Sequence, residues 1–398
     1  MSDNRANTVF LSAVRTPFGT FGGSLKGHSA TQLGAHAATA AVERAGVDAS
    51  EYGHTYFGNV IQTSADAVYL SRHVGLQAGL PESAPSLTLN RLCGSGFQAV
   101  ISAAEDIQLG HSRICLTGGT ESMSQAPHVV RGARFGLRFG TPNAFEDTLW
   151  EALTDTYCGF SMAETAENLA DEYELTREAV DAYAARSQHR AKLAWDEGRF
   201  DAEVSPVMIR KRGKEVAFEQ DEHLRPDTTV EALAGLKPYF KSDGLVTAGN
   251  ASGIGDGAAA LVVADGEFAA AHGLAPMGRL VSWGVAGVPP RIMGIGPAPA
   301  ARMAMERAGM TLDDIDLIEV NEAFSPQYCA VEKELGLDRY KVNVDGGAIA
   351  LTHPLGATGA RITTHLLHEL KRRGGGVGLG SACIGGGQGI ALILEVDG

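Results

Sequence analysis

The stretch VERAGV at 42–47 decides the architecture of this chain, because it returns as MERAGM at 305–310. Glu43 and Glu306, which are equivalent in the two stretches, lie 263 positions apart. Two further pairs of segments share this offset: CGSG at 93–96 with GATG at 356–359, and ICLTGG at 114–119 with VGLGSA at 377–382. Three matches in one register indicate an internal repeat, which determines the fold before any local pattern does.

The register of the repeat changes once. GDGAAALVVAD at 255–265 resembles GQGIALILEVD at 387–397, with an offset of only 132. The fall from 263 to 132 means that 131 residues are inserted into the first copy. We predict three parts: an N-terminal half over 1–121 that 251–276 completes, an inserted domain over 122–250, and a C-terminal half over 277–398.

Each copy has the pattern of an α/β unit. A helical segment, a strand, a Gly-rich turn and a second helical segment are followed by strands rich in Val, Ile and Leu, which suits a sheet covered by helices. We expect two similar halves related by a pseudo-two-fold axis. The insertion contains the Arg-bearing stretch HVVRGARFGLRFG at 128–140 and a polar helical run from about Ser161 to Glu197. We expect it to cover a ligand or to build an interface.

Composition and charge exclude several classes of protein. A net charge of -14 argues against binding of nucleic acid or anionic membranes. No apolar run reaches the roughly 20 residues that span a bilayer, and the start MSDNRANTVFLSAVRTP lacks the layout of a secretory signal. The five cysteines include no CxxC pair, so neither a structural zinc site nor a disulfide framework is indicated. We expect a cytoplasmic protein with reduced thiols.

Cys93 is the first candidate for chemistry. It stands in NRLCGSGFQAV at 90–100, between an extended segment and a segment with helical periodicity. At a helix N-terminus, unpaired N–H groups and the helix dipole lower the pKa of a thiol and can hold an oxyanion. The flanking Gly94 and Gly96 would let a ligand approach closely. We therefore predict a nucleophile. GSGFQA also fits a loose dinucleotide-binding pattern, but no acidic residue ends a second strand.

His353 is the second candidate. It lies in the turn VDGGAIALTHPLGATGARI at 344–362, three residues before Gly356, which is the position equivalent to Cys93. Since equivalent turns approach each other at a pseudo-two-fold axis, we expect the histidine and the cysteine to meet. A Cys–His pair is the minimum for nucleophilic acyl chemistry, in which the histidine accepts the thiol proton.

Two more polar features occupy turns of the second copy. Asn321 and Glu322 follow the strand IDLIEV, and Cys383 lies in the Gly-rich turn SACIGGGQG at 381–389. An asparagine can hold a water or a carbonyl oxygen in an oxyanion site, and a second thiol can act as acid or base at carbon. Taken singly, each of these residues could equally be structural.

Together these segments resemble the thiolases. The resemblance rests on six segments that occur in the family's order and span nearly the whole chain: NRLCGSGFQ, GGTESMS, TAGNASGIGDGAA, NEAF, GGAIALTHPLGATGAR and CIGGGQG. GNVIQTSADAVYLSRHVGL and SMSQAPHVVR are similar to the 3-ketoacyl-CoA thiolase branch. The resemblance implies a thiolase-like fold layered α-β-α-β-α, in which the insertion is the loop domain.

The resemblance also implies a reaction, namely reversible Claisen chemistry on coenzyme A thioesters. Cys93 attacks the ketone carbon of a 3-oxoacyl-CoA and keeps the acyl group, while acetyl-CoA leaves as an enolate that Cys383 protonates. Free CoA then takes the acyl group. Run backwards, the same steps join two acetyl-CoA molecules into acetoacetyl-CoA. CoA enters as a substrate, and no metal or prosthetic group is implied.

By the same resemblance, His353 activates Cys93 and, with a water held by Asn321, forms one oxyanion site. The backbone N–H groups of Cys93 and Gly385 form a second. Five residues are implied to bind substrate: Arg225 at the nucleotide end of CoA, Ser252 along the pantetheine arm, and Met162, Phe240 and Phe324 at the acyl end. Relatives whose loop domain joins dimers imply a homotetramer, a dimer of dimers.

The chain departs from the family pattern at two positions. Thr352 precedes the histidine where the family usually has glycine, so a β-branched side chain could crowd the pocket and change the backbone beside His353. Ser161, before Met162, stands where the acetoacetyl-CoA-specific branch typically has histidine, which leaves longer acyl chains open.

Two alternatives stay open from the sequence. A non-catalytic acyl-CoA or lipid carrier on the same scaffold would form no acyl-Cys93. A ketoacyl synthase also condenses acyl thioesters on a cysteine, but it takes substrate from a carrier protein and typically has a second histidine in place of Asn321. Activity with free CoA thioesters separates these possibilities.

Overall fold

The repeat in the sequence is a repeat in structure. The computed structural model describes residues 8–140, 142 and 144–398. The first half contributes β1 (Thr8–Arg15), β3 (His54–Gly58), β4 (Ser86–Leu89), β5 (Ile114–Ser122) and β12 (Gly255–Asp265), with the short β2 (Gly19–Thr20) beside β12. The second half contributes β13 (Gly278–Gly287), β14 (Leu317–Val320), β15 (Gly376–Ile384) and β16 (Gln388–Val396).

The two halves arrange their strands in the same way. The orders are β4-β3-β5-β12-β1 and β14-β15-β16-β13. In each half, two early strands are parallel (β3 with β5, β14 with β15), and the last strand lies antiparallel between the first strand and its other neighbour. An isolated parallel bridge between Ile318 and Val342 stands in the place of β4. The halves join where β1 meets β13, through the pairs Val9–Arg279 and Phe10–Gly278.

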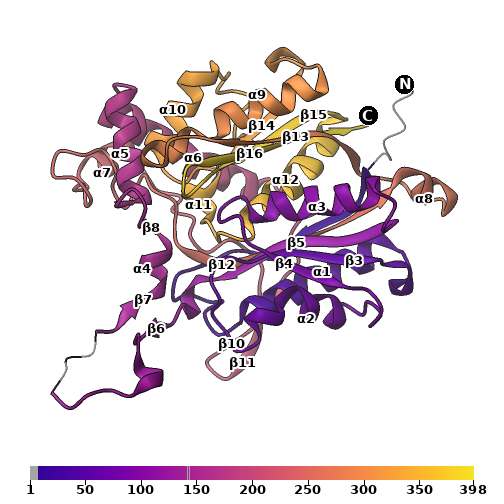
Figure 1. Ribbon diagram of the computed structural model, residues 1–398. Coiled ribbons are helices and arrows are strands. Elements are labelled where there is room, and N and C mark those ends of the chain that lie inside the picture. The colour runs from indigo at the N-terminus through magenta and orange to yellow at the C-terminus, as the bar shows by residue number, and fades with distance from the viewer. Residues whose placement is uncertain (1–7, 141, 143) are drawn as a thin grey trace.

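Helices separate and cover the two sheets in five layers (Figure 1). The outer helices of the first half are α1 (Ala30–Ala45) and α2 (Leu70–Gln77), and those of the second are α9 (Pro297–Ala308) and α10 (Ser325–Leu335). Between the sheets lie α3 (Ser95–Gln108) and α12 (Thr358–Arg373). Ser95 and Thr358, which begin these two helices, keep the offset of 263 that the repeat predicts. The layered α-β-α-β-α fold is confirmed.

The two central helices touch through glycine. A Cβ atom added to Gly96 would lie 2.3 Å from the backbone nitrogen of Ala360, and one added to Gly359 would lie 2.3 Å from that of Phe97. These two glycines are equivalent in the repeat, so the helices cross backbone to backbone at the pseudo-two-fold axis. The crossing brings together the turns that precede α3 and α12, which carry Cys93 and His353.

The inserted segment between β5 and β12 forms its own short strands and helices. It contains β6 (His128–Val129), β7 (Glu146–Asp147), α4 (Thr148–Ala152), β8 (Thr154–Asp155), β9 (Phe160–Ser161), α5 (Met162–Glu172), α6 (Arg177–Asp196), β10 (Val207–Lys211), β11 (Lys214–Phe218) and α7 (Val230–Ala234). The remaining two helices are α8 (Gly266–Ala271) and α11 (Ala348–Leu351). The predicted polar helical run is thus two helices, because Thr176 caps a new helix at Arg177.

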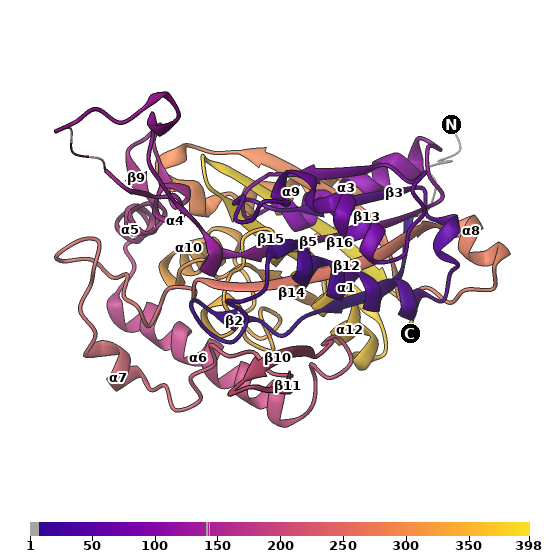
Figure 2. The ribbon, with the colours of Figure 1, turned by 90° about the horizontal axis from the view of Figure 1, so that it is seen from below.

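The inserted segment packs on both halves. Its β10–β11 hairpin shares a core with α1, and α6 shares a core with α10, along one side of the molecule (Figure 2). Buried ion pairs reinforce the contact: Arg15 of β1 bonds Glu203 at 2.6 Å and Asp221 at 2.7 Å. In the part of the chain described here, no helix is both long and apolar enough to cross a membrane.

Candidate active site

Cys93 lies in the turn from β4 to α3, two residues before the helix begins. It is buried among side chains from separate segments, which include Ile61, Leu149 and Leu355. The backbone N–H groups of Gly385 and of Cys93 itself face the sulfur. The structure therefore forms the predicted pair of N–H donors at the candidate nucleophile.

The sequence-based expectation of a lowered thiol pKa is wrong for the unliganded protein. Burial raises the pKa of Cys93 to about 11, and the two N–H groups offset only part of this effect. Desolvation disfavours the thiolate more than the nearby donors favour it. The glycines beside the cysteine also serve packing: an added Cβ at Gly94 would lie 2.6 Å from Ile384, and Gly96 contacts α12.

His353 is buried and its ring is held in one tautomer. Its Nδ1 lies 2.6 Å from the hydroxyl oxygen of Thr358, and that hydroxyl lies 2.9 Å from the carbonyl oxygen of Pro354. A hydroxyl has one proton, which it donates to the carbonyl, so Nδ1–H must donate to the hydroxyl. The Nε2 atom is then left as an acceptor. Burial, and then the charge of Arg361, lowers the pKa of His353 to about 3, which keeps the ring neutral.

Asn321 meets His353 directly. Its amide nitrogen lies 3.3 Å from Nε2 of the histidine and donates to it. Its side-chain oxygen is buried and, among the described residues, has no hydrogen-bond partner. That oxygen is therefore available to accept a hydrogen bond from a ligand.

Glu322, the neighbour of Asn321, is a structural anchor. Its buried carboxylate accepts bonds from the Tyr183 hydroxyl at 2.6 Å, the Ser187 hydroxyl at 2.7 Å and the Ile349 N–H at 3.1 Å. It thereby ties the Asn321 turn to α6 and to α11, which leads into His353.

Cys383 lies near the end of β15 and is fully buried beside Met293 and Ala323. Burial raises the pKa of Cys383 well above its usual range, and the neighbouring Cys93 raises it further. The structure thus brings the two candidate thiols close together, both in the neutral form.

The residues predicted at the acyl end surround these thiols. Met162 and Phe324 pack on the cluster that contains Cys383, and a Cβ added to Gly385 would lie 3.2 Å from the Met162 sulfur. Phe240 packs with Phe324 and stacks on Trp150 of α4, with ring centroids 6.4 Å apart. The predicted acyl end would therefore be lined by apolar side chains of α4, α5 and the turn after β14.

Ser161 has a structural task. Its hydroxyl oxygen caps α5 by accepting the Glu164 N–H at 3.3 Å, and the backbone N–H of Ser161 donates to the Glu164 carboxylate at 2.7 Å. A histidine at this position could not make the same capping box. Ser161 thus acts as the N-cap of α5.

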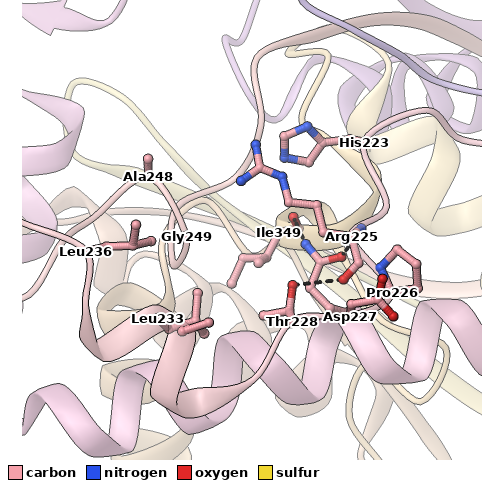
Figure 3. A pocket seen from close by; sticks show the side chains of 12 residues that line it. His223, Arg225, Pro226, Asp227, Thr228, Leu233, Leu236, Ala248, Gly249 and Ile349 are labelled. Carbon is pink, nitrogen blue, oxygen red and sulfur yellow. Dashed lines mark hydrogen bonds between the residues drawn. The ribbon is translucent and has the colours of Figure 1, made fainter.

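Arg225 lines a cavity of about 340 Å³ whose lining includes neither Cys93 nor Cys383 (Figure 3). Its side chain runs beside His223. Burial, and then the charge of the arginine, lowers the pKa of His223 to about 4. Ala248 and Gly249 line the same cavity, and the chain continues from them to Ser252, whose N–H donates to the Ala323 carbonyl at 3.0 Å. The cavity that Arg225 lines is therefore connected along one segment to the Asn321 turn.

Three contributors were missed from the sequence. Thr358 sets the tautomer of His353. It is the third residue of the GATG segment at 356–359, so this residue lay within a recognised motif. Glu121 is fully buried and its carboxylate accepts the N–H groups of Val60, Ile61 and Gly356 at 2.8–3.1 Å. Leu149 contacts Cys93 from α4 and carried no signal, because the inserted segment has no counterpart in the second copy.

The chain matches known proteins over almost its entire length. The family model described as "Thiolase, N-terminal domain" matches residues 8–267, and "Thiolase, C-terminal domain" matches residues 274–396. The chain belongs to the thiolase family. Among curated relatives, human "3-ketoacyl-CoA thiolase, mitochondrial" is 52% identical over 386 residues, which is 97% of each chain.

Solved thiolase structures share the fold. The human mitochondrial 3-ketoacyl-CoA thiolase "in complex with CoA" superimposes with a TM-score of 0.96 at 51% identity, covering 98% of each chain. The Bacillus anthracis acetyl-CoA acetyltransferase gives a TM-score of 0.96 at 49% identity, covering 99% of this chain and 100% of the other. The chain is therefore similar to thiolases of both named activities.

Proposed function

We propose that this protein transfers acyl groups between coenzyme A thioesters through an acyl-Cys93 intermediate. The observations that carry the proposal are two neighbouring thiols, Cys93 and Cys383, and a neutral imidazole with an unprotonated Nε2 in the turn whose Leu355 packs in the cluster of Cys93. A neutral imidazole acceptor in a buried site can take the proton of a thiol as that thiol attacks. Membership of the thiolase family supports the same chemistry.

The first half-reaction cleaves a carbon–carbon bond. Cys93 gives its proton to His353 and bonds the ketone carbon of a 3-oxoacyl-CoA, and the bond between that carbon and the α-carbon breaks. The α-carbon takes a proton from Cys383, so acetyl-CoA leaves and the acyl group stays on Cys93. Negative charge on the attacked oxygen is stabilised by the N–H groups of Cys93 and Gly385, which donate to charge that exists only during reaction.

The second half-reaction regenerates the protein. The thiol of free CoA gives its proton to Cys383 and attacks the acyl carbon on Cys93. The sulfur of Cys93 then recovers the proton held by His353. The thioester enolate of the first step lies at His353 and Asn321, where the free amide oxygen of Asn321 supports the proposed water. No step requires a metal or a prosthetic group.

Coenzyme A is proposed to bind along the cavity that Arg225 lines. Arg225 would pair with phosphate of the nucleotide end, and the segment from Ala248 to Ser252 would line the pantetheine arm. The structure of a relative with CoA supports a CoA site on this fold. We also propose 3-oxoacyl-CoA of fatty acid β-oxidation as substrates, and the 52% identity to a 3-ketoacyl-CoA thiolase supports this.

The test of the proposal is the rate of CoA-dependent cleavage of 3-oxoacyl-CoA substrates of increasing chain length, with Cys93→Ala as control. Cleavage that is lost in the control supports the proposal and gives the chain preference. Absence of cleavage at every length, with CoA still bound, would favour a carrier. Activity only with acyl-carrier substrates would favour a ketoacyl synthase.

The assembly is also a proposal, namely a homotetramer. The segment after β6 leaves large apolar side chains exposed: Phe135, Leu137, Phe139, Phe145 and Tyr157. It extends away from the two halves (Figure 1). Exposed large apolar side chains in one segment favour burial against another copy. Light scattering after chromatography tests this, with Phe135→Ser and Phe139→Ser together expected to give dimers. The cytoplasmic location stays a prediction.

A further inference from the structure

Thr352 adopts a backbone conformation that side chains rarely take. Its φ is 80° and its ψ is 170°, in a region that is essentially confined to glycine. Such a conformation is strained for residues other than glycine and persists only where surrounding contacts impose it. The residue is 1% exposed and directly precedes His353. The strain therefore lies at the entrance to the catalytic turn.

Contacts on three sides hold this conformation. The Thr352 N–H donates to Ala348 at the start of α11, and the His353 N–H donates to the carbonyl of Gly253, both at 2.9 Å. The Thr352 side chain fills the space in front of Gly255: a Cβ added there would lie 2.6 Å from the threonine hydroxyl oxygen. The side chain thus separates the His353 turn from the backbone at the start of β12.

The same segment is fixed on its other face. His223 packs against Gly253, where an added Cβ would lie 2.7 Å from the ring, and the N–H of Ser252 bonds Ala323 in the turn of Asn321. α11 carries Ile349, which lines the cavity of Arg225. Thr352 therefore lies where the cavity wall, the Ser252 segment and the catalytic histidine meet.

The hydroxyl does not explain why threonine is present. Its oxygen is buried and, among the described residues, has no hydrogen-bond partner, which is unfavourable for a buried polar group. The shape of the side chain accounts for the position better than its polarity does.

We propose that Thr352 is a positioning residue, whose branched side chain wedges the His353 turn against the Ser252–Gly255 segment and so sets the orientation of the histidine. The inference rests on the proposed function and adds to it. Glycine at this position would relieve the backbone strain but remove the wedge. Valine would keep the shape and remove only the unpaired hydroxyl.

The test compares Thr352→Gly and Thr352→Val with the wild-type protein. We expect the glycine variant to lose at least tenfold in kcat for 3-oxoacyl-CoA cleavage, with KM for CoA within twofold. We expect the valine variant to keep kcat within twofold and to unfold at a higher temperature. A glycine variant with wild-type kcat, or a valine variant that loses as much as glycine, would overturn the proposal.

A second readout does not depend on turnover. The pH profile of Cys93 alkylation by iodoacetamide, followed by peptide mass spectrometry, reports how well His353 accepts the thiol proton. We expect the profile of the glycine variant to move to higher pH and that of the valine variant to stay in place. Unmoved profiles in both variants would contradict the proposed wedge. A wild-type protein without cleavage activity would instead refute the proposed function and leave these profiles interpretable.

Discussion

At the scale of single residues, the site depends on which nitrogen of one imidazole carries a proton. The hydrogen bond from Nδ1–H of His353 to Thr358 leaves Nε2 as the acceptor that faces Asn321. A hydrogen bond to one ring nitrogen fixes both the tautomer and the ring orientation. Thr358 belongs to the N-terminal turn of α12, so the helix that crosses α3 also fixes the tautomer of the proposed base, His353.

Replacing Thr358 by valine tests this arrangement. Valine keeps the volume but cannot accept the bond from Nδ1–H, so the ring is free to protonate at Nε2 and lose its acceptor. We expect kcat for cleavage to fall by roughly 100-fold, the lower range for loss of general base catalysis. Thr358→Ser, which keeps the hydroxyl, should stay within a few-fold of the wild-type rate; equal rates in the valine variant and the wild type would refute the assignment.

The two thiols have different proposed tasks, which one substitution separates. Cys383→Ala removes the proton donor at carbon but leaves Cys93 and its N–H donors in place. We expect overall turnover to be abolished while acyl transfer from acetyl-CoA to Cys93 continues, as measured by peptide mass spectrometry. Loss of acylation together with turnover would contradict this division of labour.

The limits of the sequence at this scale are physical. The repeat and the resemblance predicted Cys93 and His353, and the resemblance predicted Asn321 and Cys383. The structure brings His353 to Asn321 and Cys93 to Cys383. The pKa of Cys93 was predicted in the wrong direction, because local position signals the helix N-terminus but not the burial contributed by α4 and β15. Glu121 was missed because a carboxylate that accepts backbone N–H groups has no sequence pattern.

At the scale of secondary-structure elements, Glu121 joins the turns that hold Cys93 and His353. Its carboxylate, at the end of β5, accepts four N–H bonds, from the backbone of Val60, Ile61 and Gly356 and from the side chain of Asn59. Ile61 and Leu355, which flank these bonds, belong to the same buried cluster as Cys93. One buried carboxylate therefore positions two of the chain segments that surround Cys93.

Glu121→Gln should loosen both turns. A glutamine amide presents N–H groups to part of this donor set, so about two buried donors lose their acceptor at about 1–3 kcal/mol each. We expect the free energy of unfolding in urea to fall by at least about 2 kcal/mol and kcat to fall with it. Glu395→Gln is the matched control, since its ion pair with Arg279 is partly exposed and should matter little. Equal losses in the two variants would contradict the role of Glu121.

Element boundaries were predictable where the repeat applied. The repeat predicted a helix after the Gly-rich turn of each copy, and the observed starts of α3 and α12, Ser95 and Thr358, differ by its offset of 263. In the inserted segment there is no second copy, and the predicted single polar run proved to be α5 and α6. Thr176 is a typical N-cap residue, but the polar pattern continues on both sides of it, so the sequence did not show that one helix ends and another begins there.

At the scale of the whole molecule, buried charges lock the inserted segment to both halves. Glu203 bonds Arg15 of β1 at 2.6 Å and His365 of α12 at 3.0 Å. Burial would raise the pKa of Glu203, but the charges of Arg15 and then His365 hold it at about 2. The cluster connects three parts of the chain that are distant in sequence, so no local motif could predict it.

This cluster predicts a pH dependence of stability. Burial lowers the pKa of His365, but the carboxylates of Glu203, Glu319 and Asp345 raise it to about 9, against an ordinary value of 6.5. Protonated His365 therefore stabilises the fold fully below pH 6.5, and this contribution, roughly 3 kcal/mol, is lost as the pH rises through about 9. Urea unfolding at pH 6.5 and 9.5 measures the loss.

His365→Gln provides the control for that measurement. The variant should be less stable than the wild type at pH 6.5, and the difference between the two proteins should shrink at pH 9.5. A difference that is the same at both pH values would show that the histidine does not titrate in this range.

The central claim is that the acyl group of a 3-oxoacyl-CoA passes to Cys93. The most direct measurement is peptide mass spectrometry of the protein after incubation with a defined 3-oxoacyl-CoA in the absence of free CoA. The account predicts an acyl group shorter by two carbons on the Cys93 peptide, one equivalent of acetyl-CoA in solution, and loss of the label when CoA is added. Acyl label on another residue, or acetyl-CoA released without any label on Cys93, would contradict it.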